Sequence, residues 1–266
     1  MKTIYFLLLI SLPIFSYGQS GYYIPNALLL PVHSSKQQLH ISLGVGDGYN
    51  INGSYSFTKH LALFATGTRH PGTAKRMGLF GDRFNIKKND YALTSGLGYF
   101  FTPNNERFGI VETYLGIGKF KVDNYRYSAG NAYSSLFFTQ ANYGNIFWQL
   151  NTTKRKNKHE WSKAVRFAYS DYTHYLYYFD TDDYKTKYRN LWGFNVDPTI
   201  SYSYILHQFK FNGQLGLSVP LSSVTVKEYQ INRFNEERLL TNGITKKSLF
   251  SLIARISIHY NLYLLN

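Results

Sequence analysis

The chain has 266 residues, no cysteine and a formal net charge of +14, with 29 Lys plus Arg against 15 Asp plus Glu. The absence of cysteine excludes disulfide frameworks, thiolate metal sites and cysteine nucleophiles. Aromatic residues make up a high 18% of the chain, while a mean hydropathy of −0.29 excludes a bundle of membrane-spanning helices.

The first residues of the chain predict a secretory signal peptide. Lys2 precedes an apolar run over residues 4–15, and the small residues Ser16 and Gly18 precede Gln19 with the spacing of a cleavage site. The run has about 12 residues, fewer than the roughly 20 that a spanning helix needs. We therefore expect residues 1–18 to be removed on export, and residues 19–36 to form a periplasmic or lumenal leader.

The rest of the chain alternates apolar and polar residues with a period of two, which is typical of half-buried strands. A first hairpin is predicted from strands at 38–45 and 49–57, joined at the turn dipeptide Asp47-Gly48. Further strands are expected, in chain order, at 61–68, 91–101, 108–120, 136–151, 161–172, 192–206, 209–219 and 248–263. This makes about ten strands, an even number, as single-chain outer-membrane barrels require.

The expected connections alternate in length. Short ones are predicted at 59–60, 102–107, 152–160 and 207–208, and long ones at 69–90, 121–135, 173–190 and 220–247. Outer-membrane barrels alternate short periplasmic turns with longer outer loops, and a Greek-key sandwich is not expected to do so. We therefore predict an all-β fold over residues 37–266, a closed antiparallel transmembrane β-barrel, with a soluble β-sandwich as the alternative.

Aromatic side chains near the predicted strand ends support the barrel. They lie on the apolar face, where an interfacial girdle belongs. The residues are Trp161, Phe167, Tyr169, Trp192, Tyr202 and Tyr204.

Several short motifs of the mature chain are shared with one family. They are Tyr22-Tyr23-Ile24-Pro25-Asn26, Pro31 shortly after it, Gly96-Leu97-Gly98-Tyr99-Phe100, residues 112–118 (ETYLGIG), residues 140–143 and Asp197-Pro198. Together they resemble small, largely uncharacterised outer-membrane β-barrel proteins of Bacteroidota. The chain departs from the pattern at its end, which lacks a terminal aromatic residue, and at Asp197, where we expect Glu.

The resemblance implies the outer membrane of a Gram-negative bacterium and no known activity. The expected partners are outer-membrane lipid and, during biogenesis, the barrel assembly machinery. Nucleic-acid binding would explain the positive charge but not the export signal, so we set it aside.

If the apolar face meets lipid, the charged residues of the polar face line the lumen and need partners there. They are Glu112, Arg166, Asp197, Lys210, Arg255, His40 and His259. We expect Arg166 and Asp197 to form a buried ion pair between adjacent strands, with Glu112 and Arg255 completing a network. His40 and His259 are expected to be near neighbours across the seam between the first and last strands.

A ten-strand barrel is about 20 Å across, so inward side chains can largely fill it. The inward glycines complicate this expectation, because they either leave space or mark where long side chains reach across. They are Gly96, Gly98, Gly116 and Gly118.

Basic residues gather in the first long connection, opposed only by Asp82 before Asp90. They are Arg69, Lys75, Arg76, Arg83, Lys87 and Lys88. Guanidinium groups bind phosphate bidentately, so lipopolysaccharide is the expected contact. The alternative is a solvated charged loop.

No catalytic residue, metal site or cofactor is predicted. The third long connection holds several acids and a histidine, as the rim of an omptin-type protease does: Asp171, His174, Asp180, Asp182 and Asp183. Three basic residues follow directly and no omptin motif is present, so a solvated loop is favoured. We predict a barrel with a structural or binding role. A narrow porin is the first alternative, and a rim-active hydrolase of the omptin type is the second.

Overall fold

The computed structural model describes residues 28–46, 48–77, 83–103, 109–128, 136–179, 185–221, 227–241 and 251–263. The predicted signal peptide lies outside these ranges. The described residues form strands, turns and extended chain, and none of them forms a helix that could cross a membrane.

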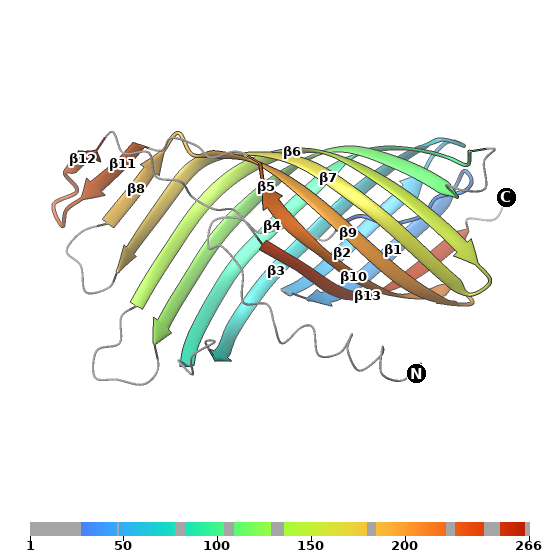
Figure 1. The fold of residues 1–266 in the computed structure, drawn as a ribbon, viewed down its shortest axis with the longest axis horizontal. Coiled ribbons are helices and arrows are strands. Elements are labelled where there is room, and N and C mark those ends of the chain that lie inside the picture. Colours follow the sequence, from blue (N-terminus) through green and yellow to red (C-terminus); the bar gives the residue numbers. More distant parts are fainter. Residues whose placement is uncertain are drawn as a thin grey trace.

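Within the described ranges, ten strands close into an antiparallel barrel (Figure 1). They are β1 (Gln38–Gly46), β2 (Gly48–Ser56), β3 (Leu61–Met77), β4 (Arg83–Phe101), β5 (Ile110–Ser128), β6 (Leu136–Lys156), β7 (His159–Phe179), β9 (Trp192–Leu206), β10 (Phe209–Pro220) and β13 (Ser251–Tyr263). Each strand pairs with the next, β7 pairs with β9, and β1 pairs with β13 to complete the ring. The predicted fold class is confirmed.

The seam between β1 and β13 lies where the sequence predicts it. Gln38 is opposite Tyr263 and Val45 is opposite Ile256. A closed sheet has no edge, so every strand of the ring has a partner for its backbone N–H and C=O groups on both sides.

The barrel is apolar outside and polar inside. Leu93 and Ile117 on the outer face are 61% and 62% exposed, while Glu112 and Asp197 on the inner face are fully buried. This is the reverse of a soluble protein and rules out the sandwich alternative, which would bury the apolar face. For the two residues predicted to line the lumen, Glu112 and Asp197, the period-two alternation therefore gave the correct side.

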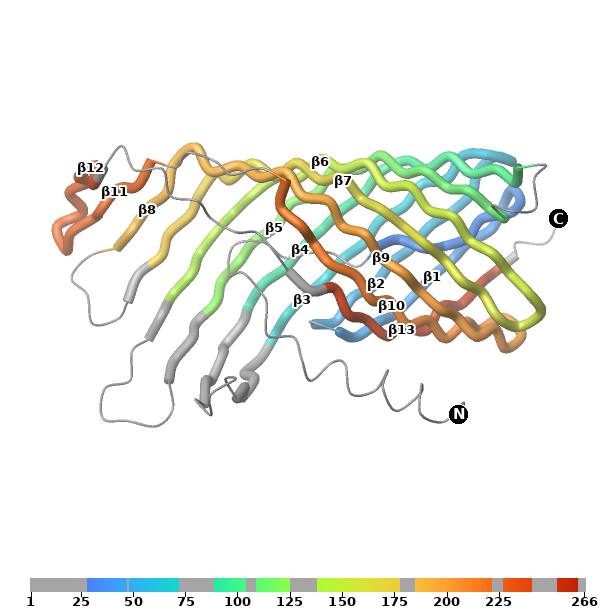
Figure 2. Tube along the Cα trace, viewed as in Figure 1, coloured from blue at the N-terminus to red at the C-terminus, as the bar shows by residue number. Residues whose placement is uncertain are grey.

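Five strands continue well beyond the barrel wall. β6 and β7 have 21 residues each, about 70 Å of strand, whereas β1 and β2 have 9. We name the two ends of the molecule accordingly. The turn end carries the two-residue turns between β6 and β7 and between β9 and β10, and the extended end carries the projecting strands, as Figure 2 shows.

At the extended end, three short strands continue the sheet from β7. They are β8 (Lys185–Arg189), β11 (Lys227–Ile231) and β12 (Glu237–Thr241), paired in the order β7, β8, β11, β12. We call them the outer sheet, seen beyond the barrel in Figure 1.

The predicted long connections are therefore largely wrong. Much of 69–90, 121–135, 173–190 and 220–247 is strand, and β6 runs to Lys156 through the predicted turn at 152–160. The reason is that these projecting segments mix polar, aromatic and aliphatic residues without a sustained alternation of period two. Backbone pairing, which does not depend on side-chain type, continues there nonetheless.

Aromatic rings cover most of the inward glycines. A Cβ at Gly98 would lie 2.3 Å from the ring of Tyr114, and one at Gly116 would lie 2.4 Å from the ring of Phe147. Gly118 lies similarly beneath the ring of Phe120. These glycines leave no empty space, because each accommodates a ring from the lumen, which settles the alternative left open by the sequence.

The seam gives a first prediction. Leu43 and Ile258 are direct partners on the outer face of β1 and β13, and the native chain has no cysteine. The double variant Leu43→Cys/Ile258→Cys should form an intramolecular disulfide in the folded protein, seen as a faster band on a non-reducing gel. The matched control is Leu43→Cys/Phe211→Cys, since Phe211 is one strand further away on β10. Equal crosslinking of both pairs would contradict the register.

The outer sheet gives a second prediction, on pH. Lys187 Nζ donates to Glu237 Oε1 at 2.6 Å and Arg189 Nη2 donates to Oε2, so both reach across β11 from β8 to β12. The hydrogen bond from Lys187 holds the pKa of Glu237 below its usual value. A carboxyl with a lowered pKa in the folded state stabilises it above the unfolded pKa, and this contribution disappears as pH falls through the folded pKa.

We therefore expect the Glu237 carboxyl resonance to titrate below the ordinary Glu range in an NMR experiment. In the variant Lys187→Met/Arg189→Gln the same resonance should move up in pH towards that range. Identical titration curves for the two proteins would show that these bridges do not act on Glu237.

Candidate functional site in the barrel lumen

A segment of the leader fills the lumen. Residues 28–33 (LLLPVH), which we call the plug, are all buried, and His33 is fully so. The sequence predicts a leader that is periplasmic or lumenal. The structure places this described part of it inside the barrel.

The plug leucines pack on apolar islands of the otherwise polar inner wall. Leu29 lies in one cluster with Phe64, Tyr114, Phe147 and Ala168, and Leu28 and Leu30 pack with Ala164. The rings of this island are those that cover Gly98 and Gly116. The glycines therefore help to shape the surface on which the plug rests.

The inner wall holds the plug by its backbone carbonyls. Gln149 Nε2 and Asn151 Nδ2 donate to the carbonyl of Leu29 at 2.7 and 2.9 Å. Gln214 Nε2 donates to Leu28 at 3.1 Å. A buried extended segment outside the sheet needs partners for its backbone groups, and inward amides of β6 and β10 supply them.

Glu112 binds the C-terminal end of the plug. Its Oε1 accepts from the backbone N–H of His33 at 2.8 Å and from the hydroxyl of Tyr114 at 3.0 Å. Asn151 Nδ2 lies 3.4 Å from its other oxygen. The predicted network in which Glu112 joins Arg255 is not formed, because Glu112 is used by the plug, a segment for which the strand pattern gave no position.

The chain leaves the plug through a tight turn into β1. Val32 has φ 62°, in the left-handed region that a β-branched residue rarely adopts. Beyond it, Gln38 Oε1 accepts from the backbone N–H groups of Ser34 and Ser35 at 2.8 and 3.2 Å. The plug is thus tied covalently and by hydrogen bonds to the first strand of the barrel.

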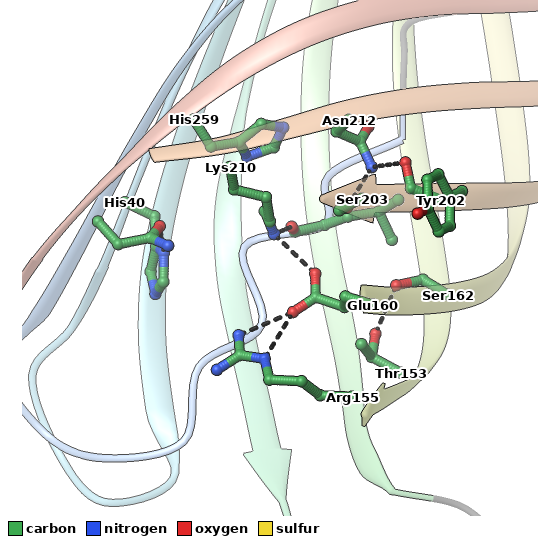
Figure 3. Close-up of polar contacts among 12 residues, drawn as sticks. His40, Thr153, Arg155, Glu160, Ser162, Tyr202, Ser203, Lys210, Asn212 and His259 are labelled. Carbon is green, nitrogen blue, oxygen red and sulfur yellow. Dashed lines mark hydrogen bonds and ion pairs between the residues drawn. The ribbon is translucent and has the colours of Figure 1, made fainter. Parts of the chain in front are cut away.

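A buried charge cluster lies beside the plug near the turn end (Figure 3). Lys210 Nζ is 3.0 Å from Glu160 Oε1, and each side chain is 1% exposed. Lys210 also donates to the carbonyl of Leu30 at 3.2 Å. Arg155, which is 42% exposed, donates to the second oxygen of Glu160 at 2.7 Å. Lys210 therefore links the barrel charges to the plug.

Glu160 is the functional residue that the sequence analysis missed. The residue falls within the predicted turn at 152–160, whereas in the structure it is the second residue of β7 and points inward. The alternation of Ser162, Ala164 and Arg166, extended downward by two residues, would have identified it. The sequence analysis also missed Gln149, Asn151 and Gln214 as residues that contact the plug. They carry no charge that would have marked them as site residues.

Arg166 and Asp197 are directly opposite each other on β7 and β9, as their strand positions predict. Arg166 donates from Nε and Nη2 to Gln149 Oε1 at 3.1 and 2.7 Å, and its guanidinium lies 4.4 Å from the ring centroid of Phe147. Ser218 donates to Asp197 Oδ1 at 2.5 Å. Through Gln149, Arg166 positions one of the amides that hold the plug.

Arg255 lies on β13, three strands around the ring from Arg166 on β7. It is 5% exposed and occupies the space above Gly44, where a Cβ would be 2.5 Å from its Nε. With the amide oxygen of Asn52 turned towards it, its Nη2 lies 2.6 Å from that oxygen. A cavity of about 10 Å³, room for one water molecule, remains between this wall and the plug.

The two seam histidines are diagonal neighbours, since His40 is opposite Asn261 and His259 is opposite Ser42. His40 Nδ1 lies 2.5 Å from Asn261 Oδ1, and the ring of His33 packs edge-on against His40 at 4.5 Å. The part of the chain that the structure describes contains no group of three His, Asp or Glu side chains that could hold a metal ion.

The predicted basic cluster is not a loop. Arg69 lies exposed on the outer face of β3, and the other five residues are in strands: Lys75 and Arg76 in β3, Arg83, Lys87 and Lys88 in β4. The side chains of these five lie outside the described part of the structure.

The acidic group at the third long connection is divided by the structure. Asp171 is exposed on β7 opposite Trp192, on the outer face, and His174 follows beyond a bulge. Asp180, Asp182 and Asp183 lie outside the described residues. Asp171 therefore faces away from the lumen.

The similarity of this chain to known proteins is weak. No family model matches the chain, and no curated protein matches it. The crystal structure of Acinetobacter baumannii CarO covers 86% of this chain and 97% of its own, with a TM-score of 0.30 and 8% identity. Similarity at this level supports no argument about the site.

The charge cluster gives a third prediction. Lys210→Met removes one member of a fully buried pair and should lower the free energy of unfolding by about 3 to 5 kcal/mol. Arg155→Ala removes the exposed partner of the same carboxylate and should cost about 1 kcal/mol or less. Urea unfolding of the refolded barrel in detergent, followed by tryptophan fluorescence, measures both.

The double variant Glu160→Gln/Lys210→Met is the control, because it removes both buried charges. It should be more stable than Lys210→Met alone. Equal losses from Lys210→Met and Arg155→Ala would mean that burial does not distinguish the two cations.

Proposed function

We propose that the protein is an outer-membrane β-barrel that is sealed by its own N-terminal segment and has a structural or binding role. The outer face supports a membrane setting. A band of exposed leucines and isoleucines lies between aromatic residues at two levels, such as Phe101 below and Tyr91 above on β4. The ten residue steps between them correspond to a height of about 25 Å for a tilted strand, the apolar height of such barrels.

The unequal ends support an orientation. Barrels of this class have short turns on the periplasmic side and longer segments outside. The turn end then faces the periplasm, and the projecting strands and outer sheet stand beyond the membrane on the cell surface. Most exposed positions of the outer sheet are polar, as a structure in water should be; Lys185, Arg189 and Lys227 are examples, while Leu239 and Leu240 of β12 are 44% and 41% exposed.

One observation supports a sealed lumen: the plug lies inside the barrel, and its backbone is hydrogen-bonded to more than one part of the wall. β6 donates to Leu29 through Gln149 and Asn151, and β10 donates to Leu28 and Leu30 through Gln214 and Lys210. These strands are three apart around the ring. On the far side, His33 Nε2 lies 2.7 Å from the hydroxyl of Ser54 on β2, so the plug has contacts around the interior. A barrel built as an open diffusion pore would keep this space filled with water.

The fourth prediction tests the seal. In planar bilayers the full-length mature protein should give no steady conductance. A variant lacking residues 19–33 should give reproducible steps, because the deletion removes the packed and hydrogen-bonded plug. Full-length Gln214→Leu/Asn151→Leu, which weakens the plug contacts on both walls, should give intermittent openings and tests the same point if the deletion does not fold.

Lys36→Gln is the matched control, since this exposed residue lies in the turn below the plug. It should behave as the wild type. Steady steps from the wild-type protein would replace the sealed barrel by the narrow porin, and recovery of the protein as a detergent-independent soluble monomer would end the membrane assignment.

A further inference from the structure

The outer face carries a row of alternating aromatic and basic side chains at the top of the apolar band. Tyr49 on β2 is opposite Arg69 on β3, Arg69 is opposite Tyr91 on β4, and Tyr91 is opposite Lys121 on β5. Lys119 is the next outward residue below Lys121 and is opposite Leu93. We call these five residues the rim row.

The members of the rim row are close enough to hold one ligand. Directly opposed residues on adjacent strands have Cα atoms about 5 Å apart, so Arg69 and Lys121 are separated by about 10 Å with the ring of Tyr91 between them. Their long side chains can reach a common group above that ring. Arg69 offers a planar guanidinium for bidentate phosphate binding, and the lysines add mobile charges.

The three cations of the rim row are not paired with any residue that the structure describes. Among the described residues, none of Arg69, Lys119 and Lys121 forms a hydrogen bond or an ion pair. Acidic side chains are few on this face: Asp123 is the next outward residue above Lys121, further from the apolar band, and Asp171 lies on β7. Three cations against one nearby carboxylate, Asp123, give the described part of this face a net positive charge.

The surface directly below the rim row is apolar. Leu93, Leu115 and Ile117 are each 61% to 62% exposed on β4 and β5. A ligand that contacted both parts would place a phosphate on the cations and hydrocarbon chains on the band. A free anion would use only the upper part, and a neutral lipid only the lower.

We propose that the rim row binds the phosphate group of an acylated, phosphate-bearing lipid of the outer leaflet. This inference rests on the proposed function, since it requires the barrel to stand in a membrane with its extended end outward. It differs from the predicted contact through a basic loop, because Arg69 belongs to a strand and lies near Lys119 and Lys121, which the sequence analysis did not single out. The girdle tyrosines Tyr49 and Tyr91 flank the phosphate at headgroup level.

The fifth prediction compares one variant with a matched control. Arg69→Gln/Lys119→Gln/Lys121→Gln removes the three charges from the outer face without touching the lumen. Its affinity for diphosphorylated lipid A in mixed detergent micelles should fall on the order of 100-fold, about fivefold for each charge. Lys163→Gln removes an exposed outward lysine two residues above Trp161 at the turn end, and should bind as the wild type does.

Two further probes separate the sources of the binding energy. Dephosphorylated lipid A should bind the wild type as weakly as the triple variant binds the phosphorylated lipid. Inorganic phosphate alone should bind neither protein at comparable concentration. Wild-type affinity in the triple variant, tight binding of the dephosphorylated lipid, or equal binding of inorganic phosphate would each overturn the proposal.

Failure here is distinguishable from failure of the proposed function. The rim row lies outside the lumen, so the triple variant should still be heat-modifiable on gels and electrically silent. A silent variant with unchanged lipid affinity would refute the lipid site alone, whereas conductance of the wild type would refute the sealed barrel alone.

Discussion

The backbone's need for hydrogen-bond partners is the constraint on which this structure depends. Away from water, an unpaired N–H or C=O group costs several kcal/mol. The ten-strand ring meets this need by closing β1 on β13, which leaves no sheet edge. The plug cannot pair as a strand inside the ring, so side-chain amides of the wall bond to its carbonyls instead. Polar side chains of the inner wall therefore satisfy the backbone carbonyls of the plug.

The buried charges follow from the same arrangement. A charged group inside the barrel needs both an opposite charge and hydrogen bonds to be tolerated. Glu160 has them from Lys210 and Arg155, and Lys210 shares its ammonium with a plug carbonyl. Glu112 is stabilised differently, by the backbone N–H of His33, the hydroxyl of Tyr114 and the amide of Asn151. Glu112 thus contacts the plug directly, and Glu160 is linked to it through Lys210. The plug therefore contributes to the stability of both buried carboxylates.

The prediction from sequence succeeded where a local pattern carried the information. Leu39, Ile41, Leu43 and Val45 alternate with polar residues, and β1 follows that alternation into the barrel wall. It failed above the apolar band, where β3 to β7 continue without a sustained alternation of apolar and polar residues, so these segments were predicted to be loops. It failed at Glu160 because the turn between β6 and β7 is only Asn157-Lys158, with Asn157 in the left-handed conformation that such a turn requires. Because the turn is this short, Glu160 belongs to β7 and faces the lumen, whereas a longer loop would have left it outside the strand.

The sequence by itself determined the all-β class and the strand order around the ring. In regularly alternating strands such as β1, β9 and β13 it also determined the side of the wall on which a residue lies, because alternation with period two is a local property of the chain. The tertiary structure alone decided that Leu29 meets Gln149 and Asn151, some 120 residues away, and that rings of Tyr114 and Phe147 cover Gly98 and Gly116. These contacts depend on the radius and stagger of the closed barrel, which bring distant strands and the leader to a common height. The residue pattern within one strand does not show at what height its residues lie relative to the other strands. The contacts of the plug could therefore be identified only from the closed fold.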